Sequence, residues 1–288
     1  MPNFVPFAII AAASSITLCA LLVRFRSRWP AVLSLSYSGM IFVFEFFIFI
    51  LWDSYEYKPG VLPIPYYDNT LGALVSNLFV VPVVATLIAA LRLRTRWILL
   101  FAFGLGGIEW LFVHIRVYEL HWWRVGYTVA TLVFFFSLAK FWMRKLREGC
   151  PRYVFVSLWM AAWSLAGTFI YLLAVSGVRT FQPGVFDDVY RDDLFAGAIA
   201  GFFKALILAW VVYRYRGVWP KIGGLAVIAA ANLLLIRLDI LNIHVALWLY
   251  WLMYMCCCVL VCCLVWLSLR SMRRMEADGS SSALTDDL

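Results

Sequence analysis

Titratable side chains cluster in a short stretch near the middle of the chain, where they could do acid–base or ligand-binding chemistry. The stretch holds Glu109, His114, Arg116, Glu119 and His121. At about 100° of rotation per helical residue, Glu109 shares one helix face with Arg116. His114 shares another face with His121. We expect either side chains that extend to the outer headgroups or a shared polar site that opens outward.

A second stretch repeats this pattern of polar residues 123 positions later in the chain. Its residues at the corresponding positions are Asn232, Arg237, Asp239 and His244. Neither stretch places two ligands one turn apart on one helix face, so no metal site is expected. All three histidines of the chain lie in these two stretches.

Three ionisable residues fall deep inside apolar segments, which makes them candidates for a functional site. They are Glu45, Glu109 and Lys204. Counted along a helix, Glu109 lies about 14 Å from the outer end of its segment, and Lys204 lies at a similar depth. A buried lysine opposite a buried glutamate forms either a neutralising structural pair or the site of a coupling ion or substrate. We therefore expect Glu109 and Lys204 to face the same interior cavity.

The elements that carry these residues are long apolar segments. Of the 288 residues, 65% are apolar and 14% are charged, which excludes a water-soluble globular protein. A transmembrane helix needs about 20 mostly apolar residues. The fold class is therefore all-α, a polytopic integral membrane helix bundle with about nine transmembrane helices. The predicted spans are residues 4–23, 31–52, 71–91, 97–118, 122–143, 152–175, 194–213, 222–241 and 244–269.

The basic residues indicate how these spans are oriented. The formal net charge is +8, but the Lys and Arg residues form short clusters between the spans. Nucleic acid is therefore not an expected partner; the lipid bilayer is. Seventeen of the 24 Lys and Arg residues fall on one side of the predicted membrane, and the positive-inside rule makes that side cytoplasmic. We predict an N-terminus outside and a C-terminus in the cytoplasm.

A comparison of the chain with itself indicates an internal duplication. Pro59-Gly60-Val61 recurs as Pro183-Gly184-Val185, and Asp68 recurs as Asp192. Units with an even number of spans would be parallel repeats about an axis normal to the membrane. The predicted parts are an N-terminal helix with a basic turn (1–29), two four-helix repeats (30–150 and 151–270) and a disordered cytoplasmic tail (271–288).

The cysteines and the short motifs assign no reaction. Five of the seven cysteines lie between Cys256 and Cys263, where we interpret them as small apolar side chains within a helix. Adjacent helical cysteines cannot meet disulfide geometry. The chain has no Walker A sequence, no dinucleotide-binding glycines, no GxSxG and no HExxH. The sequence therefore assigns no cofactor and favours a role other than catalysis.

Residues 108–146 resemble a segment of other membrane proteins. The motif comprises Ile108-Glu109-Trp110, His121-Trp122-Trp123, Tyr127-Thr128 and Ala139-Lys140. It is similar to a stretch found in small polytopic membrane proteins of spore-forming Gram-positive bacteria. The resemblance implies a bacterial plasma membrane and carries no catalytic assignment.

The function that we favour is binding or transport of a small solute or ion. The expected site is an outward-facing polar cavity at the interface between the repeats. Its candidate lining residues are Glu45, Glu109, Lys204, Asn232 and Asp239. Polar residues concentrate in the outer half of the predicted bundle, which suits a cavity open to the outside.

Two other classes of function remain open at this point. One is an outer-leaflet enzyme or lipid-handling protein with a lipid ligand. It would use His114, Glu119, His121 and His244 as acid–base groups. The other is a structural subunit of a larger membrane complex. The oligomeric state stays open with them.

Overall fold

The computed structural model describes residues 2–286, with side chains described through Arg273. In this part of the chain, nine helices are long and apolar enough to cross a membrane. The predicted all-helical fold and the number of spans are confirmed. The polar tail predicted at 271–288 falls, beyond Arg273, outside the described side chains.

Seven of the nine spans are single α-helices, and two contain a π-helical turn. The second span joins α2 to η1, and the third joins α3, η2 and α4. The helices are α1 (Phe4–Phe25), α2 (Trp29–Glu45), η1 (Phe46–Leu51), α3 (Pro65–Leu74), η2 (Val75–Val80), α4 (Val81–Ala90), α5 (Thr95–His114), α6 (Val125–Arg147), α7 (Pro151–Val175), α8 (Val189–Arg214), α9 (Trp219–Arg237) and α10 (Leu247–Asp286).

Local sequence explains where several of these helices begin. Proline stands at the first or second position of α2, α3, α7 and α9, where its missing N–H is not needed. At the start of α8, the Asp188 carboxylate accepts hydrogen bonds from the N–H groups of Tyr190 and Arg191, at 2.8 and 3.2 Å. This is the capping that an aspartate provides at a helix N-terminus.

Four short strands join the helix ends on one face of the bundle. β1 (Tyr55–Tyr57) pairs antiparallel with β2 (Tyr118–Leu120), and β3 (Arg179–Phe181) pairs antiparallel with β4 (Leu241–Ile243). We call this side the strand face.

Strands β2 and β4 stand where the sequence predicted the ends of the spans at 97–118 and 222–241. The helices before them, α5 and α9, end four residues earlier than expected. Arg116 and Asp239 follow with positive φ angles of 60° and 53°, which end the helical path. The chain then satisfies its backbone groups by strand pairing instead of by helix.

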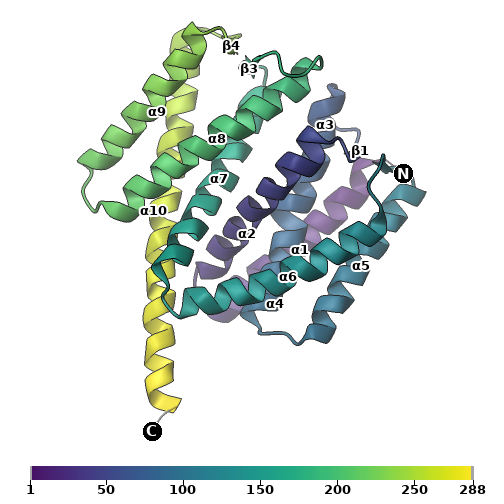
Figure 1. Ribbon diagram of the computed structural model, residues 1–288, viewed down its shortest axis with the longest axis vertical. Coiled ribbons are helices and arrows are strands. Elements are labelled where there is room, and N and C mark those ends of the chain that lie inside the picture. The colour runs from purple at the N-terminus through teal and green to yellow at the C-terminus, as the bar shows by residue number, and fades with distance from the viewer. Residues whose placement is uncertain (1, 287–288) are drawn as a thin grey trace.

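The helices form one bundle with α2 and α7 at its centre (Figure 1). α7 packs most extensively on α8 and α2, while α5 and α9 lie at opposite edges. The N-terminus lies beside β1, where Asn3 Nδ2 donates to the carbonyl of Lys58 at 3.1 Å. The bundle thus has two halves that meet along α2 and α7.

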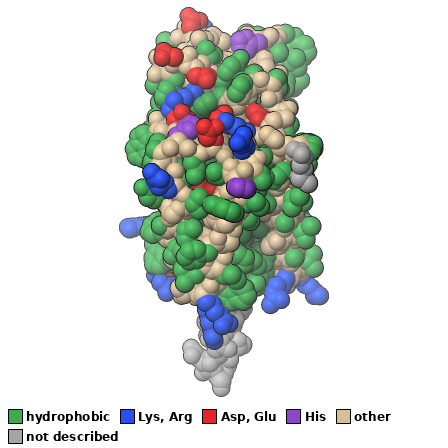
Figure 2. Space-filling model, turned by 90° about the vertical axis from the view of Figure 1, so that its right-hand side faces the viewer, with side chains coloured by type: hydrophobic (Ala, Val, Ile, Leu, Met, Phe, Trp, Pro, Cys, Tyr) green, Lys and Arg blue, Asp and Glu red, His purple; other side chains and the backbone are tan. Residues whose placement is uncertain are grey.

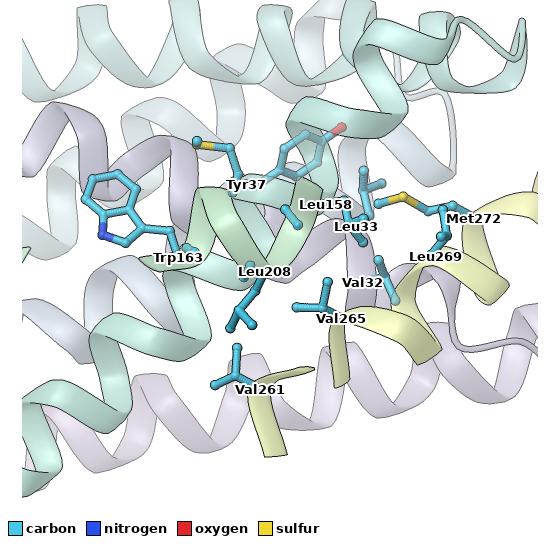
Figure 3. Close-up of a cluster of buried hydrophobic side chains, with 14 of the residues drawn as sticks. Val32, Leu33, Tyr37, Leu158, Trp163, Leu208, Val261, Val265, Leu269 and Met272 are labelled. Carbon is cyan, nitrogen blue, oxygen red and sulfur yellow. The ribbon is translucent and has the colours of Figure 1, made fainter. Parts of the chain in front are cut away.

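Small and apolar side chains fill the junction between the halves. Figure 3 shows residues of α2, α7, α8 and α10, among them Leu33, Leu158, Leu208 and Val265, in one buried cluster. Ser36 Oγ on α2 donates to the carbonyl of Ser157 on α7 at 2.9 Å. Close approach of small residues is the usual way in which helices pack within a membrane.

Charged side chains are segregated along the bundle. Figure 2 shows the acidic side chains and the histidines in the upper part of this face, together with some Lys and Arg, whereas the lower edge carries Lys and Arg without acidic side chains. The basic turns, which include Arg24 to Arg28 and Arg92 to Arg96, lie at the helix ends opposite the strand face. We call that side the basic face.

Candidate ligand-binding cavity

A cavity of 510 Å³ lies within the first half of the bundle, and we call it the two-glutamate cavity. Its walls come from α2, η2, α4, α5 and α6, with β1 and β2 at the strand-face end. Aromatic and aliphatic side chains make most of its surface. Only Val156 and Met160, both on α7, belong to the second half. The cavity therefore lies mainly inside one half and not at the predicted interface between the halves.

Two carboxylates enter this cavity. Glu45, at the end of α2, accepts a hydrogen bond on Oε1 from the Tyr55 hydroxyl at 2.6 Å. Its Oε2 is buried and has no hydrogen-bond partner among the described residues. Glu109 Oε1, on α5, is buried and unpartnered in the same way. Buried polar atoms are almost always hydrogen-bonded. These two oxygens in one cavity therefore lack the hydrogen-bond donors that buried carboxylates normally have.

One π-helical segment, η2, lines the cavity, and the other, η1, adjoins it. η1 begins directly after Glu45, and η2 contains Asn77, which also lines the cavity. Pro82 lies five residues after Asn77 and has no N–H to return to the π-helical carbonyl. π-Helical turns occur frequently at functional sites. Pro82 is the one feature of the sequence that indicates a distortion in this span, and nothing in the sequence predicts a π-helix.

Three tyrosines from the paired strands close the strand-face end of the cavity: Tyr55, Tyr57 and Tyr118. Burial first, and then the nearby carboxylates of Glu45 and Glu109, raise the pKa of Tyr57 far above its usual range. The pKa of Tyr118 is raised by burial, by Tyr57 and by the same two carboxylates. Both phenols therefore stay neutral.

The cavity opens sideways between helices. Four of its lining residues are also exposed on the outside of the bundle: Val43 by 36%, Phe44 by 40%, Ile108 by 36% and Phe134 by 70%. Phe134 lies near the middle of α6, far from both helix ends. At that height the surroundings of a membrane span are hydrocarbon. The wall of the cavity at Phe134 therefore faces the interior of the membrane.

A second, smaller cavity of 100 Å³ lies between the two halves. Its walls include α7 residues such as Trp163 and α8 residues such as Leu194. Glu45 and Asn77 line both cavities. These two side chains therefore stand where the two-glutamate cavity meets the centre of the bundle.

Lys204 is held apart from this cavity, in the second half. Its Nζ donates to Asn232 Oδ1 at 3.0 Å and lies 5.0 Å from the ring of Tyr254. Asn232 in turn donates to the Tyr250 hydroxyl. The predicted pairing of Lys204 with Glu109 is not formed. The position of a residue along its helix gives its depth in the membrane, but it does not give the direction in which the side chain points.

The remaining predicted site residues lie exposed on the strand face and its turns, outside the cavity. The His114 ring stacks on Trp110, with centroids 5.6 Å apart. His121 Nδ1 lies 2.7 Å from the carbonyl of Asp53, and His244 Nε2 lies 2.9 Å from the Thr180 hydroxyl. The described structure does not gather the histidines into one site. Arg116, Arg237 and Asp239 are exposed as well.

Glu119, also on this face, forms an ion pair with Lys58, which joins β2 to the end of β1. The hydrogen bond from Lys58 lowers the pKa of the Glu119 carboxyl. The same bond, with a smaller contribution from Glu56, raises the pKa of Lys58. Both partners are exposed, so the pair contributes little beyond aligning the strands.

A buried polar network near the strand face was not predicted from the sequence. Arg179 forms an ion pair with Asp193, and their side chains are 3% and 0% exposed. Asp193 also accepts from the Tyr67 hydroxyl at 2.8 Å and from the Phe181 N–H at 2.7 Å. Every charged group of this network has a partner, which is typical of a structural role. The adjacent carboxylates of Asp192 and Asp193 were its only signal in the sequence.

Comparison of the chain with known protein families, with curated proteins and with solved structures finds no match.

Proposed function

We propose that this multi-span membrane protein binds or transports a small amphiphilic solute in the two-glutamate cavity. The observation that carries the proposal is the pair of buried, unpartnered carboxylate oxygens, on Glu45 and Glu109, in one cavity within the spans. Ionisable groups inside a membrane are costly and line binding sites or pathways. A bound solute would supply the partner that the protein itself does not.

The shape of the cavity favours a solute with a large apolar part. Its 510 Å³ falls in the range of small-molecule sites, about 300–1,000 Å³. Its walls are mostly aromatic and aliphatic, and the exposed Phe134 marks an opening within the membrane. A solute that entered there would have to cross hydrocarbon, which excludes strongly hydrated ions.

The proposal includes the internal duplication, which corresponding hydrogen bonds support. Tyr57 N–H donates to Asn69 Oδ1, and 124 residues later Phe181 N–H donates to Asp193 Oδ1. Lys58 N–H donates to the Val117 carbonyl, and Gln182 N–H donates to that of Ile240. The strand pairs also correspond. Local chemistry of this detail is not expected from regular loop spacing alone.

We also propose that the basic face is cytoplasmic and the strand face external, in a bacterial plasma membrane. The segregation of Lys and Arg clusters supports this orientation. In this arrangement the carboxylates lie between the external strands and the middle of the membrane. The cavity would take up its solute from the outer half of the bilayer.

The test is saturable binding of an aryl-alkyl probe to the purified protein in detergent. A naphthyl-propyl compound is titrated, and the melting temperature is followed by tryptophan fluorescence, because a ligand of the folded state raises it. Thr131 lines the cavity, so Thr131→Phe should reduce the affinity at least tenfold. Ser137→Phe is the matched control, because Ser137 lies exposed on the same helix with the same type of hydroxyl-to-carbonyl bond. Equal binding to both variants would exclude the cavity as the site.

A further inference from the structure

Lys204 and Val80 occupy corresponding positions in the two halves. Each lies 15 residues after the start of a 26-residue span, Val189–Arg214 or Pro65–Ala90. The proposed duplication also relates them, since its offset is 124 from Pro59 through Val80 and 123 from Glu109 onward. Val80 lines the two-glutamate cavity. The first half therefore has a short apolar side chain and open space where the second half has a lysine.

The second half surrounds its lysine ammonium with an amide and aromatic rings. Lys204 Nζ lies 3.0 Å from Asn232 Oδ1, 5.8 Å from the Phe181 ring and 5.0 Å from the Tyr254 ring. Lys204 itself is 8% exposed. Aromatic faces attract a cation by their negative π-surface. The second half therefore contains a cation site, which the ammonium group of its own Lys204 occupies.

The first half keeps two of these three walls without the cation, and Thr131 stands at the position of Tyr254. Glu109 stands at the position of Asn232, and Tyr57 stands at that of Phe181; both line the cavity. The exchange of amide for carboxylate adds negative charge where the lysine is absent. Glu45 adds a second carboxylate with an unpartnered oxygen. One half therefore holds a cation beside a neutral amide, and the other holds carboxylates beside empty space.

We propose that the two-glutamate cavity takes an organic ammonium ion, whose nitrogen occupies the space that corresponds to Lys204 Nζ. The inference rests on the proposed function and names its class of solute. The ammonium group lies between Glu109, Glu45 and the ring of Tyr57. The apolar remainder of the ligand extends toward the sideways opening at Phe134. No covalent step is involved.

A pair of probes of equal shape tests the charge. One is naphthyl-propyl-trimethylammonium, and the other is its neutral isostere, in which carbon replaces the quaternary nitrogen. We expect the cation to bind at least tenfold more tightly to the unmodified protein. Glu109→Gln and Glu45→Gln should each reduce that preference several-fold, measured in each variant as the ratio of its affinities for the two probes.

A variant that carries its own cation in the cavity gives the most direct test of the inference. Val80→Lys places an ammonium on the wall of the cavity at the position of Lys204, and should abolish binding of the cationic probe. Val80→Met has a neutral side chain of similar reach, and should weaken both probes alike while the preference for the cation remains. Should Val80→Lys fail to fold, the ratio of the two probes in Val80→Met and Glu109→Gln still decides the question.

The outcomes separate the two proposals. Equal affinity for the two probes, unchanged by Glu109→Gln, would overturn the ammonium inference and leave the cavity as a site for neutral solutes. If Val80→Lys and Val80→Met lowered the affinity for both probes to the same extent, that result would also count against the ammonium inference. Absence of saturable binding by either probe would overturn the proposed function itself.

Discussion

Asp68 and Asp192, 124 residues apart, make the same three hydrogen bonds. The Asp68 carboxylate accepts from the N–H groups of residues 60, 61 and 62 at 2.7–2.8 Å. The Asp192 carboxylate accepts from those of residues 184, 185 and 186 at 2.8–3.1 Å. Consecutive N–H groups that converge in this way form an anion-binding turn. Each half thus fastens its strand-face loop to its third or seventh span with an internal carboxylate.

Replacement of either aspartate should loosen its loop. Asp68→Ala and Asp192→Ala each leave three N–H groups without an acceptor, so we expect a loss of about 2 kcal/mol or more in folding free energy. Each variant should melt at a lower temperature and be cut faster by protease in its own loop. Asp187→Ala, at an exposed position in the second loop, is the control. A normal melting temperature in all three variants would contradict the role assigned to the two carboxylates.

Gly39 should be intolerant of any side chain. A Cβ at this position would overlap the backbone of Met160 on α7, so Gly39→Ala must force the central helices apart. We expect a clear drop in melting temperature. In contrast, Gly107→Ala meets no atom within 4 Å and should be neutral or stabilise α5 by up to about 1 kcal/mol. A smaller loss for Gly39→Ala than for Gly107→Ala would argue against the close packing of α2 and α7.

The orientation is tested by fusing topology reporters at defined positions. Reporters after Arg96, Arg147 and Tyr215 should be active on the cytoplasmic side, because basic clusters mark these turns. Reporters near Gly60 and Pro183 should be active outside. A cytoplasmic signal from either of the last two positions would refute the proposed orientation and the alternation of the nine spans.

Hydropathy and charge were sufficient to predict the bundle, because spans are long and their apolar composition is a property of the sequence alone. They also identified Glu45 and Glu109, since an ionisable residue in an apolar run stands out without any structure. The helix ends were less accurate. The third span begins at Pro65 instead of residue 71, because α3 carries polar residues that contact the strand-face loop.

The partners of the candidate residues could not be predicted, since they depend on helix rotation and on contacts distant in sequence. Lys204 meets Asn232 and not Glu109. The Tyr55 hydroxyl reaches Glu45 only because β1 pairs with β2 and turns back over the cavity. The two π-helical turns likewise have no sequence signal apart from Pro82. The cavity is a product of packing, which hydropathy does not encode.

The Lys58–Glu119 pair should give a small dependence of stability on pH. The lowered pKa of Glu119 means that its contribution is present above the ordinary carboxyl pKa of 4.5 and is lost as the pH falls through the lowered value. The raised pKa of Lys58 means that its contribution is present below 10.5 and is lost as the pH rises through the raised value. Glu119→Gln should therefore cost at most about 0.5 kcal/mol near pH 7.

High salt should reduce this cost, because exposed ion pairs are screened. The measurement is the melting temperature of the protein and of Glu119→Gln at low and at 1 M salt, at pH 7. A loss that is large, or equal at both salt concentrations, would show that Glu119 acts through something other than this pair.

Lys204 and Asn232 should be energetically coupled. Lys204→Met keeps the volume of the side chain but leaves Asn232 Oδ1 buried without its donor, at a cost of about 1–3 kcal/mol. Asn232→Leu leaves a buried ammonium without its acceptor, which should cost more. The double variant removes both unmet groups and should lose less than the sum of the two, with a coupling of about 0.5–3 kcal/mol. Unfolding of the four proteins in mild detergent, followed by tryptophan fluorescence, gives the cycle. Additive losses would mean that the rings of Phe181 and Tyr254 alone hold the ammonium. The correspondence of Asn232 with Glu109 would then no longer support a cation site in the first half.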